Sequence, residues 1–338
     1  MKGLQRILIS SCLVIILVVL STGCGVGSLF APKPYKETQF LMDTIIDITA
    51  YGQGNEAAVK AAFDEFRRIN ELTNRFDDNS QVTKINQAAG KAKVQVDADV
   101  ITMLKLARSR SEQLGGALDV TIGALTELWG VGHKGEFVPS QPEIEAARLL
   151  VDYRLLEIDD KERTVFLPKA GMSIDLGAVA KSYANRRAIE VLKAKGIKSA
   201  LVNAGGEVRV IGTRPDGQPW RVGVQDPRDM EGLAAKVALT EWDSLETSGD
   251  YQRFFIKDNV RYAHIIDPRT GTQPREVASV TIVSNSDSHA DVLSTAMFVL
   301  GVEKGQELLK QYPGTEALFI TNDGKKVVTP GLAGKIEF

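Results

Sequence analysis

The sequence predicts an α+β protein in which mixed or antiparallel sheets pack against helices. Long segments have apolar residues every three or four positions, and shorter alternating segments are separated by turn residues. At residues 200–213 a strand pattern runs through two glycines directly into another strand. A dinucleotide-binding fold needs GxGxxG at the start of a helix, so we exclude a Rossmann fold and expect a hairpin there.

Length and composition are those of an ordinary globular protein. The chain has 338 residues, of which 43% are hydrophobic and 25% charged, and this is enough for a large core. Its length is compatible with one large domain or with two. The formal net charge of −2 gives no electrostatic reason to expect nucleic-acid binding.

The N-terminal segment has the pattern of an export signal. Lys2 and Arg6 precede an apolar run at residues 7–20, which is short for a membrane span but typical of a signal-peptide core. Residues 21–23, Ser-Thr-Gly, then lead to Cys24, and together they resemble a bacterial lipobox. An uncleaved N-terminal anchor or ordinary secretion is the alternative.

This pattern divides the chain into three parts. We expect a signal peptide over residues 1–23, a lipidated Cys24 with a tether over 24–37, and a folded domain over 38–338. Cys12 lies in the segment to be removed, so the mature chain would keep a single, acylated cysteine, with no disulfide and no catalytic thiol. The expected location is extracytoplasmic, in the bacterial cell envelope, anchored to a membrane by lipid.

Helical spacing is clearest at residues 55–75, where the apolar face comprises Val59, Ala62, Phe63, Phe66, Ile69 and Leu72. Other predicted helices lie within 77–86 and at 100–114, 142–150 and about 177–196. Predicted strands form a pair at 38–51 and hairpins at 155–167, 200–213 and 317–329, with further short strands from 220 to 255. Residues 129–141 are predicted as a surface loop, and His133 within it receives no role.

Asp119 and Asp175 stand at positions that suggest a structural or ligand-binding role. Asp119 lies among apolar neighbours after a glycine pair, so it is either a helix N-cap or a ligand contact. Asp175 ends a predicted short strand where a helix begins, so it is either an N-cap or part of a site.

Residues 262–301 carry the strongest chemical pattern. His264 ends a short alternating strand, and residues 267–271 form a rigid turn with proline and glycine. A histidine beside such a turn is a candidate base, because its titration range includes neutral pH. A further strand is expected between this turn and residue 286.

Residues 286–301 are then predicted as a helix with an apolar face, and Ser286, Asp287 and Ser288 are candidate N-caps. Asp291 and Thr295 are four positions apart, which places a carboxylate and a hydroxyl on one helical face. Two such oxygens can hold Mg²⁺ and leave positions for water and phosphate. The alternative is a capping aspartate and a threonine bonded to its own helix.

The segments HIIDPRTG at residues 264–271 and ADVLSTA at 290–296 resemble the signature of the ApbE family, the FAD:protein FMN transferases. Family-like elements also surround Met42 and occupy residues 115–125, 171–196 and 247–251, in family order. The resemblance extends from about residue 39 to 330 and implies an ApbE-like, T-fold-like architecture. It further implies that residues 38–338 are the catalytic domain.

The resemblance implies a reaction and a site. FAD would be cleaved, its FMN half would be attached through a phosphoester to a threonine of a partner protein, and AMP would leave. Mg²⁺ would be held by Asp291, Thr295 and the Ala178 carbonyl, with Ser294 near it. His264 would take the proton of the threonine, helped by an ordinary pKa near 6.5. The expected FAD contacts are Met42, Phe76, Ala117, Leu118, Asp119, Asp175, Lys181 and Ile265.

The expected partners are FAD, the membrane, and threonine-bearing acceptor proteins such as subunits of membrane redox complexes. Three alternatives remain open from sequence. Water could replace the threonine, which would make the protein a Mg²⁺-dependent FAD pyrophosphatase. The protein could instead be a non-enzymatic FAD-binding lipoprotein, or a structural lipoprotein in which Asp291, Thr295 and His264 only cap and pack.

Overall fold

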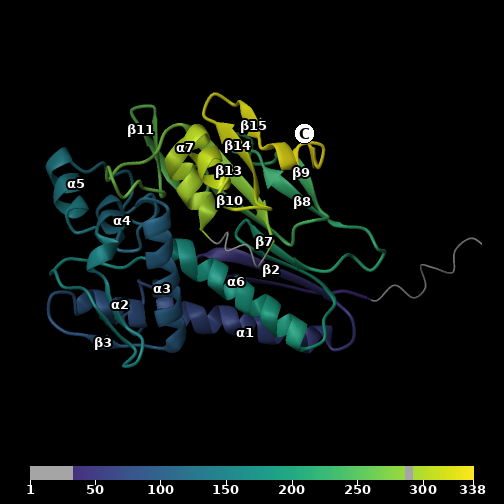
Figure 1. Ribbon diagram of the computed structural model, residues 1–338, viewed down its shortest axis with the longest axis horizontal. Helices are drawn as coiled ribbons and strands as arrows, with labels where there is room; N and C mark the ends of the chain where they lie inside the picture. The colour runs from purple at the N-terminus through teal and green to yellow at the C-terminus, as the bar shows by residue number, and fades with distance from the viewer. Residues whose placement is uncertain (1–32, 286–291) are drawn as a thin grey trace, which may run out of the picture. The chain divides into compact units, whose positions relative to one another are not determined.

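A central antiparallel sheet organises the fold (Figure 1). The structure, a computed structural model, describes residues 33–285 and 292–338, and Pro34–Phe338 form one compact unit. In this part of the chain the sheet has eight strands, and every neighbouring pair is antiparallel. In spatial order the strands are β1 (Tyr35–Leu41), β2 (Thr44–Tyr51), β6 (Ser199–Ala204), β7 (Glu207–Ile211), β10 (Ser244–Gly249), β13 (Val277–Ser284), β14 (Glu316–Thr321) and β15 (Lys326–Val328).

Three smaller antiparallel sheets surround the central one. Their strands are β16 (Ile336–Glu337), β9 (Leu233–Leu239) and β8 (Trp220–Gln225); β3 (Val94–Gln95), β5 (Thr164–Phe166) and β4 (Glu157–Asp159); and β11 (Phe254–Lys257) with β12 (Val260–Ala263). The described helices are α1 (Asn55–Thr73), α2 (Gln81–Gln87), α3 (Ala98–Gln113), α4 (Gly123–Trp129), α5 (Gln141–Arg148), η2 (Tyr153–Leu155), α6 (Gly177–Ala194), α7 (Leu293–Leu309) and η3 (Pro330–Leu332).

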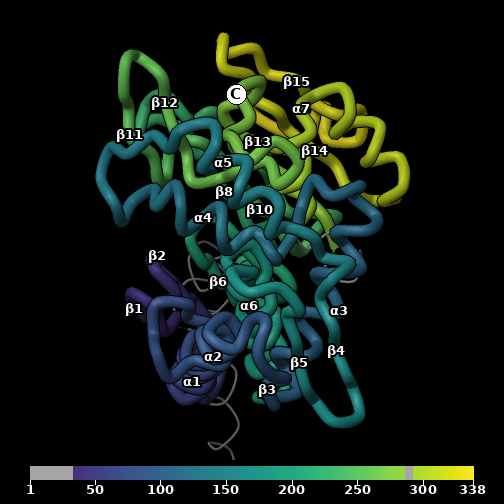
Figure 2. The backbone as a smooth tube through the Cα atoms, turned by 90° about the vertical axis from the view of Figure 1, so that its left-hand side faces the viewer, coloured from purple at the N-terminus to yellow at the C-terminus, as the bar shows by residue number. Residues whose placement is uncertain are grey.

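The sheet is covered by helices on one face and by strands on part of the other. Helices α1, α3, α6 and α7 contribute to one large core, in which the apolar stripe of α1 is fully buried against β2 and α6. In the turned view α6 lies between α1 and α2 on one side and α7 with β14 and β15 on the other (Figure 2). A second core lies between β8–β9 and strands β7, β10 and β14. Burial of apolar faces on both sides explains why this sheet is rich in β-branched residues.

Helix α7 changes direction at Gly301, where φ is 80° and ψ is −174°. This backbone conformation is open essentially to glycine alone. A Cβ at this position would lie 1.9 Å from Glu276 Oε2, and Glu276 Oε1 accepts a hydrogen bond from the Val302 amide at 2.9 Å. The glutamate therefore caps the helical segment that continues after the kink.

The structure confirms the predicted fold class and the absence of a Rossmann sheet. It also confirms the hairpins and the long helices within a few residues of their predicted bounds. Helix α4 and the part of α7 after Gly301 were not predicted, and Trp129 ends α4 instead of opening a loop. None of the helices in the described part of the chain has the length and apolar character that crossing a membrane requires.

One local prediction around the expected site is wrong. The short strand ending at Asp175 is only an isolated bridge between Ser173 and Ile122. Helix α7 begins at Leu293, because Val292 before it has a left-handed φ of 71°. The expected N-caps at residues 286–288 and Asp291 itself lie outside the described residues.

Candidate functional site

Turns and strand ends from distant parts of the sequence meet on one side of the central sheet, where its inner strands end. This region is called the sheet edge below. Antiparallel register places Ile46 opposite Ala204 and Glu207 opposite Glu246, so the β1–β2 turn, the β6–β7 turn and the end of β10 lie together. The Thr247 amide on β10 donates to the Gly206 carbonyl at 3.3 Å across this edge.

The two turns at this edge have left-handed backbone conformations. Met42 and Asp43 in the β1–β2 turn have φ of 54° and 58°, and the glycines of the β6–β7 turn have φ of 58° and 90°. Consecutive positive φ values are typical of tight hairpin turns. At Gly205 a side chain is also excluded by space, because a Cβ would lie 2.2 Å from Thr44 Oγ1. The structure thus places the start of β2, which follows the turn that contains Met42, beside the glycine turn.

Helix α6 begins over the same edge. Lys181, in its second turn, donates from Nζ to the Gly205 carbonyl at 3.3 Å. Asp175, just before the helix, accepts a hydrogen bond on Oδ1 from the Gly177 amide at 2.9 Å. A carboxylate is favourable at a helix N-terminus because the unpaired amides and the helix dipole are positive there. Ala178 lies in the first turn of α6.

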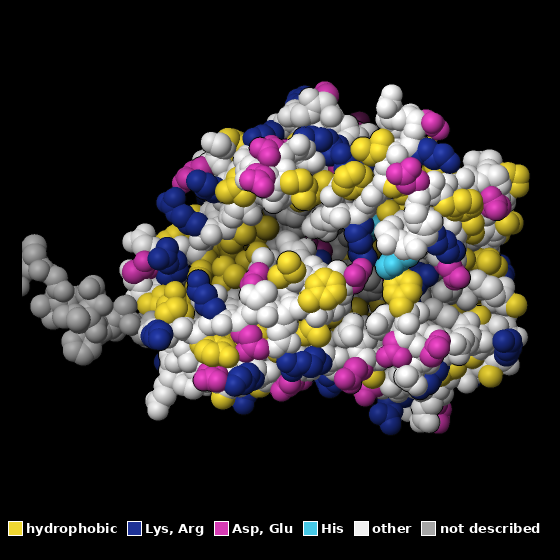
Figure 3. Space-filling view, turned by 180° about the vertical axis from the view of Figure 1, so that it is seen from behind, with side chains coloured by type: hydrophobic (Ala, Val, Ile, Leu, Met, Phe, Trp, Pro, Cys, Tyr) yellow, Lys and Arg dark blue, Asp and Glu magenta, His cyan; other side chains and the backbone are white. Residues whose placement is uncertain are grey.

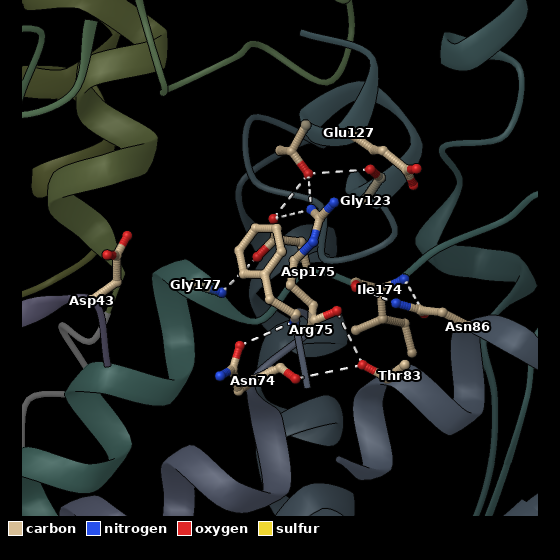
Figure 4. A network of polar contacts seen from close by, with 12 residues as sticks. Asp43, Asn74, Arg75, Thr83, Asn86, Gly123, Glu127, Ile174, Asp175 and Gly177 are labelled. Atoms are coloured by element: carbon tan, nitrogen blue, oxygen red, sulfur yellow. Dashed lines mark hydrogen bonds and ion pairs between the residues drawn. The ribbon is translucent and has the colours of Figure 1, made fainter. Parts of the chain in front are cut away.

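The second oxygen of Asp175 belongs to a network that sequence reasoning missed (Figure 4). Arg75 Nη1 lies 2.7 Å from Asp175 Oδ2, and the Thr126 hydroxyl donates to the same oxygen at 2.9 Å. Arg75 Nη1 also donates to Thr126 Oγ1. Burial raises the pKa of Asp175, but the charge of Arg75 and these donors outweigh it, and the net pKa is lowered. Asp175 is therefore a carboxylate at neutral pH.

An exposed aromatic ring stands beside this network. The Phe76 side chain is 64% exposed, which is unusual for phenylalanine. The guanidinium of Arg75 lies 5.2 Å from its ring centre, and the His133 ring lies 4.6 Å from it. Phe76 is therefore an exposed ring next to the Arg75 network, and His133, which received no role from sequence, packs against it.

A cavity of about 310 Å³ adjoins the network, and its lining consists of Arg75, Thr83, Asn86, Gln87, Glu127, Gly171, Met172 and Ser173.

The predicted contacts at residues 117–119 are buried in the structure. Asp119 Oδ1 accepts hydrogen bonds from the Thr121 amide at 2.8 Å and its hydroxyl at 2.7 Å, and Oδ2 accepts from the Tyr153 amide at 2.9 Å. Burial raises the pKa of this carboxyl against the effect of these donors. The carboxyl therefore holds this loop against the chain at Tyr153, and it is not a helix cap, since α4 begins at Gly123. Ala117 and Leu118 pack in the main core.

His264 lies directly after β12, as predicted, and its main-chain and side-chain nitrogens both face the Arg253 carbonyl. The amide donates to that oxygen at 3.0 Å, and Nδ1 lies 3.3 Å from it. Because a carbonyl can only accept, this contact favours the tautomer with the proton on Nδ1 and leaves Nε2 as an acceptor. The neighbouring Ile265 is buried.

The environment of His264 disfavours its charged form. Burial lowers its pKa to about 3, and the positive charges of Arg253 and Lys181 act in the same direction. These neighbours place the pKa of His264 below the ordinary value of about 6.5. Arg253 is itself paired with Asp43 of the β1–β2 turn, with Nη1 2.8 Å from Oδ2. His264 is neutral at physiological pH and can accept a proton only weakly in this state.

The hydroxyl groups of three side chains lie close together where α7 begins. Ser248, near the end of β10, is hydrogen-bonded to Ser294 at 2.8 Å and to Thr295 at 3.1 Å, and Ser294 is 0% exposed. Within residues 33–285 and 292–338 no three His, Cys, Asp or Glu side chains cluster as metal ligands. The described donors here are oxygens, which Mg²⁺ prefers. They fit a magnesium site that would also need a carboxylate such as Asp291.

The edge as a whole has the chemistry of an anion-binding site. The N-termini of α6 and α7 both lie there, as shown by the contacts of Lys181 with Gly205 and of Thr295 with Ser248. Helix N-termini favour phosphate groups because their amides and dipoles are positive. On the face opposite to Figure 1 the surface is hollowed, and histidine, basic and acidic side chains border the hollow together with hydrophobic ones (Figure 3).

Comparison with known proteins gives consistent relatives. The profile of the ApbE family matches residues 42–319. FAD:protein FMN transferases of Treponema pallidum and Klebsiella pneumoniae are each 33% identical to the chain, over 93% and 86% of its length and 92% and 90% of their own. Among solved structures, the ApbE protein of Thermotoga maritima aligns with a TM-score of 0.82 and 34% identity, over 89% of this chain and 98% of its own. The flavin transferase ApbE of Vibrio cholerae aligns with a TM-score of 0.78 and 28% identity, over 88% and 98%.

The protonation of His264 can be tested directly. Because burial and two positive neighbours lower its pKa to about 3, we expect its ring to stay neutral between pH 5 and 8 without ligand. Nuclear magnetic resonance of histidine-labelled protein measures this, and the His264→Asn variant identifies the signals. A protonation midpoint near 6.5 for those signals would show that the ring is in an ordinary aqueous environment.

Proposed function

This chain belongs to the ApbE family, and we propose that it cleaves FAD and attaches the FMN half through a phosphoester to a threonine of a partner protein. The enzyme type is that of the FAD:protein FMN transferases. The observation that supports this reaction best is the meeting of the α6 and α7 N-termini with Asp175, Lys181 and His264 at one sheet edge. An edge of this kind suits a pyrophosphate.

The reaction is a displacement at phosphorus. The threonine oxygen forms a bond to the phosphorus of the FMN half, and the bond from that phosphorus to the bridging oxygen breaks. AMP leaves with the electron pair of that bond, and the hydroxyl proton passes to a base. No oxidant or reductant is needed, so atoms and charge balance with FAD and the acceptor alone.

The chain's own residues supply binding and proton transfer in this proposal. Lys181 stabilises the negative pyrophosphate through its positive charge. Phe76 offers an exposed ring on which the isoalloxazine can stack. Met42, Ala117, Leu118 and Asp119 remain proposed flavin contacts. Asp175, held as a carboxylate, keeps the start of α6 in place.

His264 is our candidate for the base, through Nε2. Its pKa of about 3 in the unliganded chain reflects burial and two nearby cations. Bound pyrophosphate would bring negative charge to this region, which raises the pKa of a nearby imidazole. The base would therefore become effective when FAD is bound.

Asp291, Ser294, Thr295 and the Ala178 carbonyl are the residues that would hold Mg²⁺. When bound there, the ion offsets charge on the phosphates and orients the leaving group. Ser248 would support the two hydroxyls from β10 through its hydrogen bonds to Ser294 and Thr295.

One assay separates this function from its alternatives. The domain is incubated with FAD and Mg²⁺, with and without a threonine-bearing acceptor such as a membrane redox-complex subunit. Transfer gives AMP and an acceptor that carries covalent flavin, and replacing the threonine of the acceptor abolishes the labelling. Release of FMN and AMP without labelling indicates a pyrophosphatase, bound intact FAD indicates a flavin-binding lipoprotein, and no binding indicates a structural role.

The metal assignment predicts the behaviour of Asp291→Asn. This change removes the one anionic ligand proposed for Mg²⁺ while keeping the size of the side chain, so transfer should fall at least tenfold at limiting Mg²⁺. High Mg²⁺ should restore part of the rate by mass action. Asp287→Asn is the matched control and should transfer normally. Equal rates for both variants and the wild type at limiting Mg²⁺ would remove Asp291 from the site.

The base assignment predicts a rate defect in His264→Asn with little change in FAD affinity. Loss of a general base typically slows a reaction by about 10²–10⁴, and we expect at least a tenfold loss of transfer at pH 7. The comparison variant is His133→Asn, whose ring contacts Phe76 and should affect FAD binding more than rate. A wild-type rate for His264→Asn would show that another group takes the proton.

The N-terminal pattern leads to a proposal about location. We infer cleavage before Cys24, acylation of that cysteine and attachment to a membrane of the bacterial envelope, with the domain on the extracytoplasmic side. Intact-mass analysis of the protein from a lipoprotein-processing bacterium should give a chain that begins at an acylated Cys24. Retention of Met1, or a free thiol at Cys24, would contradict this.

A further inference from the structure

Arg75 connects three segments that are far apart in the sequence. It follows α1, and its guanidinium reaches Thr126 in α4 and Asp175 before α6 (Figure 4). Thr126 closes the triangle by donating to Asp175 Oδ2 at 2.9 Å. The three side chains therefore form one hydrogen-bonded unit in which each contacts the other two.

This unit is largely removed from water. The Arg75 and Asp175 side chains are 15% and 20% exposed, so the attraction between them is screened less than in a surface ion pair. Removing the arginine alone would leave a carboxylate in a place where water solvates it poorly. The carboxylate would then change its orientation or its protonation.

Asp175 links Arg75 and Thr126 to the start of helix α6. Its Oδ2 is held by Arg75 and Thr126, and its Oδ1 accepts from the Gly177 amide at the first residue of the helix. One turn later Lys181 reaches the Gly205 carbonyl at the sheet edge. The position of the α6 N-terminus therefore depends on both oxygens of one carboxylate, and one of them is fixed by Arg75.

The same arginine also supports the exposed aromatic ring. Its guanidinium lies 5.2 Å from the Phe76 ring centre. The backbone around it is fixed as well, because the Asn74 side chain accepts from the Phe76 amide at 3.0 Å and the Arg75 carbonyl accepts from the Thr83 hydroxyl at 3.0 Å. Arg75 thus touches both parts of the site that are expected to meet FAD.

We propose that Arg75 is a positioning residue for flavin binding, which holds the Asp175 carboxylate and the Phe76 ring in the arrangement that receives FAD. The inference rests on the proposed function for its ligand. Arg75 acts through Asp175 and Phe76 and not on the reacting atoms, so its loss should affect binding of FAD more than the chemical step.

The test compares Arg75→Gln and Arg75→Lys with the wild type. The dissociation constant of FAD is measured by fluorescence titration, and KM for FAD and kcat are measured in the transfer assay. We expect Arg75→Gln to raise both the dissociation constant and KM at least tenfold, with kcat within about threefold of wild type. Arg75→Lys should recover part of the affinity, because lysine keeps the charge but lacks the planar fork.

Two further variants make the test specific. Arg148→Gln removes an arginine from a surface pair with Glu145 and should leave FAD binding unchanged. Thr126→Val keeps the shape of the side chain but removes the hydroxyl that joins Arg75 and Asp175, and should weaken FAD binding by a smaller factor, about two- to fivefold. It also serves as the test if Arg75→Gln does not fold.

The outcomes separate this inference from the proposed function. Arg75→Gln with a lower melting temperature but an unchanged dissociation constant and KM for FAD would overturn the inference and leave a purely structural ion pair. An unchanged dissociation constant in Thr126→Val would overturn it equally if Arg75→Gln does not fold. Failure of the proposed function appears in the wild type itself, as absent transfer, whereas the role of Arg75 is judged from FAD binding relative to wild type.

Discussion

Antiparallel pairing across the central sheet is the constraint on which the site depends. Each strand of the series β2, β6, β7 and β10 reverses the direction of its neighbour, so the turns at residues 42–43 and 205–206 and the end of β10 must lie at one edge. The helices that follow or cover these strands begin at the same edge, because Lys181 contacts Gly205 and Thr295 contacts Ser248. The strand order therefore brings these turns and helix starts together at one place in the fold.

Neighbouring groups at this edge keep the Asp175 carboxyl charged and the His264 ring neutral. Arg75 and Thr126 hold Asp175 as a carboxylate, whereas burial and the charge of Arg253 hold His264 as a neutral ring. A negative ligand near His264 would raise the pKa of the ring and so weaken the bias against its protonation. In this account, binding of FAD raises the pKa of His264 and so prepares its ring to accept a proton.

Local patterns predicted the elements of the fold but not the contacts between them. Helix α1 was predictable because its buried residues recur at helical spacing, and the β6–β7 hairpin because two glycines stand between two strands. The resemblance to known transferases supplied Asp175 and His264, which spacing alone left ambiguous. Arg75 could not be found in this way, because its partners lie 51 and 100 residues away and nothing in the local sequence marks it. The lowered pKa of His264 could not be predicted for the same reason: Arg253 and Lys181 reach it only in the folded chain.

The central claim is that a hydroxyl of a partner protein, and not water, attacks the phosphorus of FAD. The most direct measurement runs the reaction in ¹⁸O-labelled water and analyses AMP, free FMN and the acceptor by mass spectrometry. The account predicts unlabelled AMP in equal amount to flavin-bearing acceptor, because the new bond to phosphorus uses the oxygen of the acceptor. Label from water in FMN or AMP, together with an unmodified acceptor, would contradict it.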